Sequence, residues 1–338
     1  MTTLKDIAKV ANVNVSTVSK ALRNSNDLNI ETITLIRRIA DEMKYPYSSV
    51  ISKSTKDPVI GIVCPEIISS YYTNIIDSFN VRVRDEGYNT IFSVSDFSSE
   101  RELECIRLLI KSNVCGIVCF TENSVNVSAV KEIADSDDIT FLFVSTAGDI
   151  INFDSISIDD HHSAMIAVNH LTGLGHKRIA YIGDRLSSIR KKSFLTALSD
   201  THIVPVENFI IESDLRFEEC GYEGMKYLLS LNTIPTGVFA AYDNIAIGAM
   251  RAIYEAGLSI PDDISVVSID NIKTSAYLYK GLTTVTEPTS DLGEIASSLI
   301  IDKIRDRNRT VQSIKLRPTL NIRETTAKPK LLNLQSNT

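Results

Sequence analysis

The 338-residue chain has 43% hydrophobic and 23% charged residues, the composition of a soluble globular protein with ample length for two or three domains. No apolar run reaches the length of a transmembrane helix, and the start, MTTLKDIAKV, has no apolar signal core. These features argue against membrane association and a secretory signal, so we expect a cytoplasmic protein. The formal net charge of −7, taken as an average, argues against a nucleic-acid binder.

The average charge hides an uneven distribution. Residues 1–56 hold nine Lys or Arg against five Asp or Glu, whereas the remainder holds 26 basic residues against 37 acidic ones. A basic first segment on an acidic body fits local contact with phosphates, with the body repelled from DNA.

Residues 3–24 predict two short helices joined by a tight turn. Thr3 can cap the first helix, with Asp6 three residues on as a carboxylate version of the capping box. Asn12 tolerates the left-handed backbone that such a turn requires, and Asn14 can cap the second helix. The apolar side of the second helix leaves these residues on its outward side and first turn: Val15, Ser16, Thr17, Ser19 and Lys20.

Such a pair of helices is typical of a helix-turn-helix that reads the major groove, although a small helical hairpin with polar residues is an alternative. A third helix is predicted from Asn29, and with the first two it would close a small core. Asn29 and Thr32 near its start could offer donors to phosphate, as helix N-termini often do.

Residues 45–58 are rich in Ser and β-branched residues, which indicates a linker of low helicity.

From Val59 strands and helices alternate, which predicts mainly parallel sheets with helices on both faces. The strands are too many for one compact sheet, so we expect two α/β lobes with ligands at the carboxyl ends of the strands. The last strand is predicted over residues 314–323.

The five cysteines are an odd number and contain no CxxC pair, so buried reduced thiols in a cytosolic protein are the simplest account.

The run Asp159-Asp160-His161-His162 resembles a metal cluster. Adjacent residues at a strand end point in different directions, however, so we expect a cleft carboxylate and a helix start there, and no metal. No phosphate-loop or Gly-x-Ser-x-Gly motif is present, and we expect neither a cofactor nor an enzyme.

Seven motifs in order resemble the lactose-repressor/galactose-repressor (LacI/GalR) family of transcription regulators. They are LKDIAKVANVNVSTVSKAL at the start, VIGIVCPEIISSYY, HLTGLGHKRIAYIGD, FAAYDNIAIGAM, GLSIPDDISVVSIDN, LTTVTEP and LRPTLNIRETT. The resemblance covers about residues 2–326. It implies an all-α helix-turn-helix headpiece followed by a two-lobed α/β body like that of periplasmic sugar-binding proteins.

On this resemblance the expected domains are a headpiece (1–44), a linker (45–58), an effector-binding and dimerisation body (59–328) and a loose tail (329–338). Lobe one would take residues 59–157 and 287–315, and lobe two residues 158–286 and 316–328. A homodimer would place two headpieces on successive major grooves of double-stranded operator DNA. An effector in the cleft between the lobes would alter the headpiece spacing.

The resemblance assigns base contacts to Val15, Ser16 and Lys20, where lysine replaces the commoner arginine. Phosphate-contacting or cap positions would be Thr3, Lys5, Thr17, Ser19, Asn29 and Thr32. The linker departs from the family pattern, because the usual wedging leucine is replaced and Ile51 is the nearest apolar substitute. We therefore expect a weak or absent hinge helix.

The effector residues implied by the resemblance are Tyr71, Tyr72, Asp159, Arg190, Arg216, Tyr242, Asp243, Asp270 and Glu287. Tyr71 and Tyr72 would stack on the ligand. Arg190 would donate hydrogen bonds to the ligand's oxygens, and Asp270 would accept hydrogen bonds from its hydroxyl groups. Two departures matter: Tyr242 replaces a common Asn, and Arg216 stands where an aromatic residue is usual, although Phe217 could serve after a one-residue shift. If Arg190 and Arg216 both face the cleft, the ligand could be anionic; the alternative is that Arg216 is a solvated loop residue.

These observations predict a DNA-binding regulator, specifically a repressor of a carbohydrate-utilisation operon controlled by a small sugar or sugar derivative. One alternative is a regulator of the same fold that responds to a nucleobase or a partner protein. A sugar-handling enzyme or a transport binding protein is a more remote alternative.

Overall fold

The computed structural model describes residues 3–22, 29–43, 58–121, 126–137, 139–145, 150 and 152–330. The chain divides into two compact units, Met1–Pro58 and Val59–Thr338, which are described separately below. Within the described residues no helix is both long and apolar enough to cross a membrane.

The first unit contains three helices: α1 (Leu4–Ala11), α2 (Val15–Leu22) and α3 (Ile30–Glu42). The predicted capping box is present, because Asp6 N–H donates to Thr3 Oγ1 and the Asp6 carboxylate accepts from Thr3 N–H. Asn12 ends α1 with φ 52°, in the left-handed region, as the sequence predicts. Asn29 Oδ1 accepts from Glu31 N–H at 2.9 Å at the start of α3. The three helices enclose a core of Ile7, Ala8, Val18, Ala21, Ile36, Ile39 and Ala40.

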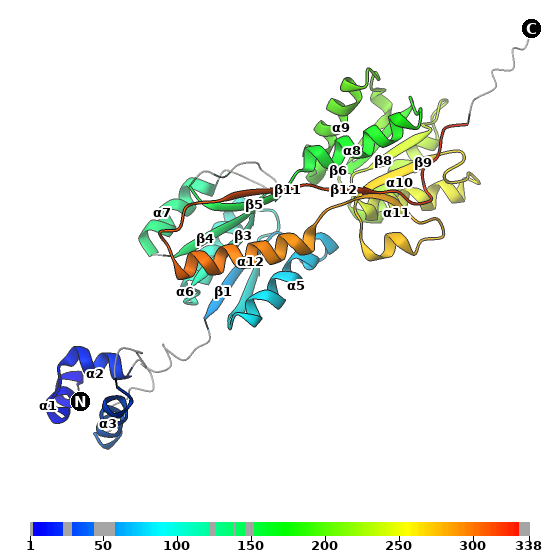
Figure 1. Ribbon diagram of the computed structural model, residues 1–338. Helices are drawn as coiled ribbons and strands as arrows, with labels where there is room; N and C mark the ends of the chain where they lie inside the picture. Colours follow the sequence, from blue (N-terminus) through cyan, green and yellow to red (C-terminus); the bar gives the residue numbers. More distant parts are fainter. Residues whose placement is uncertain are drawn as a thin grey trace, which may run out of the picture. The chain divides into compact units, whose positions relative to one another are not determined.

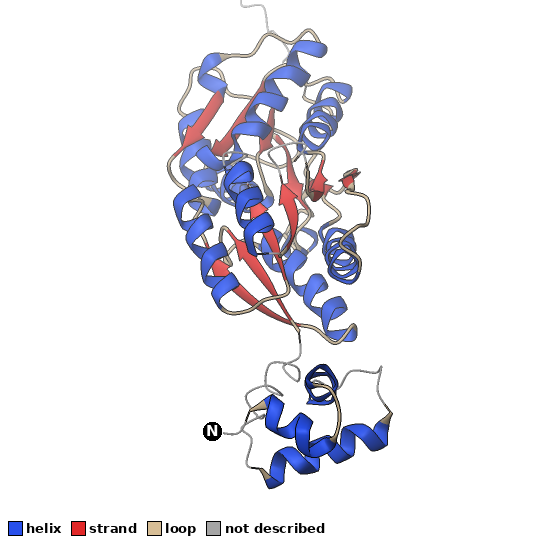
Figure 2. Cartoon of the chain, turned by 90° about the vertical axis from the view of Figure 1, so that its left-hand side faces the viewer, coloured by secondary structure: helices blue, strands red, loops and turns tan. Residues whose placement is uncertain are grey.

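The second unit contains two six-stranded sheets, each covered by helices on both faces (Figures 1 and 2). The first sheet has the order β11-β5-β4-β3-β1-β2, and all its pairings are parallel. Its strands are β1 (Val59–Cys64), β2 (Asn89–Val94), β3 (Gly116–Thr121), β4 (Thr140–Ser145), β5 (Asp154–Ile158) and β11 (Ser313–Leu316). Its helices are α5 (Ser70–Asp85), α6 (Ser99–Lys111), α7 (Val127–Asp137) and α12 (Thr289–Arg305). We call these elements lobe one.

Alternate residues of the strands in lobe one enter separate cores. Val118 and Phe120 pack with residues of α5 and α12, whereas Ile117 and Cys119 pack with residues of α6 and α7. Because both of their faces are buried, the central strands β1, β3 and β4 are nearly continuous apolar runs rather than alternating ones.

The second sheet has the order β12-β10-β9-β8-β6-β7 and is parallel except for the pairing of β12 with β10. Its strands are β6 (Ile179–Asp184), β7 (Ile210–Ser213), β8 (Gly237–Ala240), β9 (Ser265–Asp270), β10 (Thr283–Thr286) and β12 (Thr319–Asn321). Its α-helices are α8 (Asp160–Gly173), α9 (Ser188–Asp200), α10 (Phe217–Leu229) and α11 (Asp243–Glu255). Short 3-10 helices, η2 to η4, span Arg185–Ser187, Glu207–Phe209 and Lys273–Ala276. We call these elements lobe two.

The chain passes between the lobes after β5, after β10 and after β11. The single strand predicted over residues 314–323 is therefore wrong: β11 belongs to lobe one and β12 to lobe two, and Figure 1 shows this segment in red along both. Pro318 lies in the break, where a residue without a backbone N–H cannot donate to a sheet.

Candidate functional site

The outward surface of α2 carries three of the residues expected to read DNA. Val15, Ser16 and Lys20 are exposed, while Val18 and Ala21 on the opposite side are buried in the three-helix core. Ser16 and Lys20 are four residues apart and so share one face of the helix. A helix fixed from behind by a small core and presenting a hydroxyl and a cation can reach base edges in a major groove.

The other expected DNA-contacting residues lie within α2 and on either side of it in the sequence. Thr3 and Asn29 act as helix caps, Lys5 is exposed and Thr17 and Thr32 are partly exposed. The side chain of Ser19 and the whole of Ile51, with the rest of the linker up to residue 57, lie outside the described residues.

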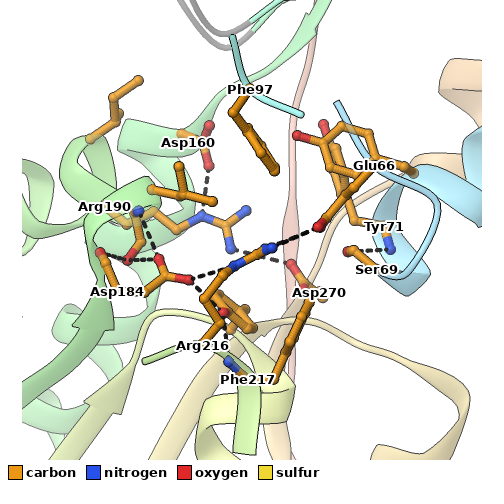
Figure 3. Close-up of a pocket in the computed structure, with 15 residues that line it drawn as sticks. Glu66, Ser69, Tyr71, Phe97, Asp160, Asp184, Arg190, Arg216, Phe217 and Asp270 are labelled. Atoms are coloured by element: carbon orange, nitrogen blue, oxygen red, sulfur yellow. Dashed lines mark hydrogen bonds and ion pairs between the residues drawn. The ribbon is translucent and has the colours of Figure 1, made fainter. Parts of the chain in front are cut away.

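A cavity of about 100 Å³ lies at the carboxyl ends of the strands, between the two lobes of the body (Figure 3). Lobe one contributes Glu66, Ser69, Tyr71, Tyr72 and Phe97 to its lining. Lobe two contributes Asp160, Asp184, Leu186, Ser187, Ile189, Arg190, Arg216, Phe217, Tyr242 and Asp270. We call this cavity the cleft.

Arg190, at the start of α9, holds three carboxylates together. Its Nε donates to Asp160 at 2.9 Å, Nη1 to Asp270 at 3.2 Å and Nη2 to Glu287 at 3.0 Å. Nη1 also donates to the Ala241 carbonyl, so four donor contacts are made inside the protein. Burial disfavours the charge, but the attraction of the carboxylates outweighs it and holds the pKa of Arg190 well above its ordinary value.

Arg216, just before α10, pairs with lobe one across the cleft. Its Nη1 and Nη2 donate to the two oxygens of Glu66 at 2.6 and 3.1 Å, and its Nε lies 3.5 Å from Asp184 Oδ2. The guanidinium carbon lies 5.4 Å from the Phe97 ring centre and 4.5 Å from that of Phe217. The hydrogen bonds to Glu66 raise the pKa of Arg216 above its ordinary value, against its partial burial.

Tyr242 and Asp184 line the cleft next to Arg216. The Tyr242 hydroxyl donates to Asp184 Oδ2 at 2.7 Å and accepts from Phe217 N–H at 3.1 Å. The other Asp184 oxygen accepts from the Ser187 N–H and hydroxyl, both at 3.0 Å. Burial, together with Asp184, raises the pKa of Tyr242 far above its ordinary value, so the hydroxyl remains a donor.

Three residues assigned to the effector do not line the cleft, which corrects those expectations. Asp243 is fully buried and accepts from Ser268, Ser275, Thr284 and the Ile272 N–H, so it joins α11 to β9, to β10 and to the segment between these strands. Asp159 caps α8 through the His162 N–H. Glu287 is buried against Arg190 and Ser163, behind the lining. In each case the carboxylate is used to satisfy buried donors or a helix end.

The structure brings the other expected effector residues together: Tyr71, Tyr72, Arg190, Arg216, Tyr242 and Asp270. Tyr72 is mostly buried, with its ring against Phe97 and Phe120, so Tyr71 is the more accessible of the two tyrosines. The sequence left open whether Arg216 or Phe217 takes the usual aromatic position, and both side chains line the cleft.

Sequence reasoning missed Glu66, Phe97, Asp160 and Asp184 as cleft residues. Glu66, Phe97 and Asp184 follow or end strands β1, β2 and β6, and the rule that ligands bind at strand carboxyl ends could have found them. Asp160 lines the cleft, whereas Asp159, the expected effector residue, caps α8. The neighbouring His161 contacts Ser193 at 3.1 Å, so the Asp-Asp-His-His run is divided among different partners.

Comparison with known proteins adds to this geometry. Residues 3–47 match the model of bacterial regulatory proteins of the lacI family, and residues 168–326 match a periplasmic binding protein-like domain. The PurR HTH-type transcriptional repressor of Klebsiella pneumoniae is 28% identical over 327 residues, which is 95% of each chain. The ribose operon repressor of Haemophilus influenzae is 28% identical over 330 residues, covering 96% of this chain and 98% of the relative.

Solved structures show the same fold. A LacI family regulator from Enterococcus faecium with bound ribose has 26% identity and a TM-score of 0.70, covering 80% of this chain and 99% of that one. The lac repressor dimer bound to operator has 23% identity and a TM-score of 0.75, covering 96% and 99%.

Proposed function

Because this chain belongs to the lacI family of bacterial transcriptional regulators, we propose that it represses a carbohydrate-utilisation operon under the control of a small sugar or sugar derivative. The observation that carries the DNA-binding part is the lacI-family match over residues 3–47, the segment in which α2 exposes Ser16 and Lys20. In this proposal α2 enters the major groove of the operator.

The arrangement of the cleft supports an effector with several polar groups. Tyr71 and Phe217 offer aromatic faces, and Asp160, Arg190 and Asp270 offer acceptors and a donor within one lining. Sugars combine apolar ring faces with a rim of hydroxyls, which such a lining matches. A ribose operon repressor and a ribose-bound regulator among the similar proteins point to the same class of ligand.

Exposed apolar residues on the body support a homodimer. Ile91 and Phe92 are about half exposed on β2, an edge strand, and Tyr277 and Tyr279 in lobe two are each 87% exposed. A similar structure is a lac repressor dimer on operator. A dimer would place two headpieces on successive major grooves, and effector binding in the body would alter their spacing. We also propose the domain limits expected from the sequence, namely a headpiece (1–44), a linker (45–58), a body (59–328) and a tail (329–338).

The test is binding of the full-length protein to the promoter upstream of its own gene at several salt concentrations. Lys20→Ala should cost about 1–3 kcal/mol on the specific site and less on random DNA. Lys273→Ala, an exposed lysine of the body, is the matched control and should leave the affinity unchanged. Equal binding to promoter and random DNA by the wild-type protein would refute the proposal.

A further inference from the structure

The guanidinium of Arg216 lies in a set of groups that together describe a cation-binding site. Glu66 contacts it with both oxygens, Asp184 is a second carboxylate nearby, and Phe97 and Phe217 face it with their rings. Carboxylates combined with aromatic rings are the chemistry that recognises organic cations.

These surrounding groups are more deeply buried than the cation they hold. The side chains of Glu66 and Asp184 are 8% and 2% exposed, whereas that of Arg216 is 32% exposed. Glu66 would lose two charge-assisted hydrogen bonds if Arg216 moved away, and a second cation would restore them, whereas Asp184 would keep its hydrogen bonds from Tyr242 and Ser187.

Arg216 also holds the two lobes together. Glu66 and Phe97 follow β1 and β2 of lobe one, whereas Arg216, Phe217 and Asp184 belong to lobe two, as Figure 3 shows around the central guanidinium. With this ion pair made, the volume of the cleft is about 100 Å³, less than the roughly 300 Å³ at which small-molecule sites begin. Separation of Arg216 from Glu66 would therefore widen the cleft for a larger ligand.

The charge of the cleft opposes an anionic ligand. Two arginines, Arg190 and Arg216, face five carboxylates: Glu66, Asp160, Asp184, Asp270 and Glu287. Burial raises the pKa of Asp270 and of Glu287, but two added protons would still leave the group negative. The sequence-based suggestion of an anionic effector therefore loses its support, since both arginines are already paired.

We propose that Glu66, Asp184, Phe97 and Phe217 form a cation-binding site which Arg216 fills in this structure, and that the effector is a sugar derivative whose ammonium or guanidinium group takes over this site. The inference rests on the proposed function, because it concerns the effector of that same cleft. Exchange of one cation for another separates Arg216 from Glu66 without leaving either carboxylate unpaired. A sugar acid or sugar phosphate would instead add negative charge beside Glu66 and Asp184.

The test empties the site and refills it with a small probe. Full-length Arg216→Ala protein is titrated calorimetrically with methylguanidinium, with its uncharged counterpart methylurea, and with inorganic phosphate. We expect methylguanidinium to bind at least about tenfold more tightly than methylurea, because its hydrogen bonds are charge-assisted, and we expect no binding of phosphate. Arg216→Gln provides a second variant if the alanine protein does not fold.

Two further variants make the result specific to this site. Adding Glu66→Gln to Arg216→Ala should weaken methylguanidinium binding at least about tenfold, because the bidentate carboxylate is lost. Arg185→Ala, which removes an exposed arginine paired with Asp214, should bind no more probe than the wild-type protein. Equal binding of methylurea, binding of phosphate, or indifference to Glu66→Gln would overturn the proposal.

Operator binding by the same proteins separates this inference from the proposed function. A protein that binds its operator specifically but fails the methylguanidinium test refutes the cation site alone. A protein that passes the probe test but shows no operator preference refutes the DNA-binding function alone.

Discussion

Arg190 and Glu287 join two parts of the body that the chain reaches 97 residues apart, with Arg190 Nη2 donating to Glu287 Oε1 at 3.0 Å. Glu287 lies in the passage from β10 to α12, and Asp160, another partner of Arg190, follows the passage from β5. One buried guanidinium thus ties together two of the three connections between the lobes.

Replacement of Arg190 by Met should destabilise the body by about 3–5 kcal/mol, because Asp160, Asp270 and Glu287 would be left buried without their shared cation. Urea unfolding measures the change. Arg185→Met, which disrupts an exposed pair with Asp214, is the control and should have a much smaller effect. If both variants lost similar free energy of unfolding, the buried ion pairs of Arg190 would be no more stabilising than the exposed pair of Arg185.

Stability should depend on pH through Glu287. Burial raises its pKa to about 7, despite Arg190, so the folded protein retains a proton that the unfolded chain, with a pKa near 4.5, releases earlier. The folded state then binds more protons, and the free energy of unfolding falls as pH rises through this interval.

Glu287→Gln removes that titration. Relative to the wild-type protein, the variant should therefore gain stability as pH increases from 5 to 8, measured by urea unfolding at each pH. Glu223→Gln, at an exposed position, is the control and should track the wild-type curve. A difference between Glu287→Gln and wild type that stays constant with pH would contradict the prediction.

Asp243 should act on stability, because it accepts from three hydroxyls and one backbone N–H in a fully buried position. Asp243→Ala leaves these donors unpaired and should cost at least about 3 kcal/mol in urea unfolding. Asp262→Ala, at an exposed position of the same lobe, should cost far less. An Asp243→Ala protein as stable as the control would mean that these buried donors find other partners.

Phe92 should contribute to self-association, because it lies half exposed on the edge strand β2 beside Ile91. Phe92→Asp should shift the protein to a monomer in sedimentation experiments and lower operator affinity at least about a hundredfold, through loss of the second headpiece. Val204→Asp changes an 84% exposed apolar residue of lobe two and is the control. A dimeric Phe92→Asp protein would place the interface elsewhere.

The local features of this chain were predictable from sequence, because they depend on neighbouring residues. The capping box of Thr3 and Asp6, the left-handed turn at Asn12 and the cap at Asn29 arise within a few residues of one another. The alternation of apolar strands and helices likewise indicated parallel sheets with two covered faces. Pro318 indicates a break in the segment predicted as the last strand. That the two halves of this segment join different sheets, however, depends on the fold of the whole body.

The partners of the charged side chains were decided by the tertiary structure alone. Asp243 and Asp270 both belong to strand ends or helix starts in the sequence, yet one is buried among hydroxyls and the other lines the cleft. Arg216 meets Glu66, 150 residues away, only because the lobes bring β1 and the start of α10 together. Sequence alone therefore determined the family resemblance, most of the helices and strands and the outward face of α2, since these follow from local pattern. The electrostatics of the cleft depend on long-range contacts and burial, which no local pattern encodes.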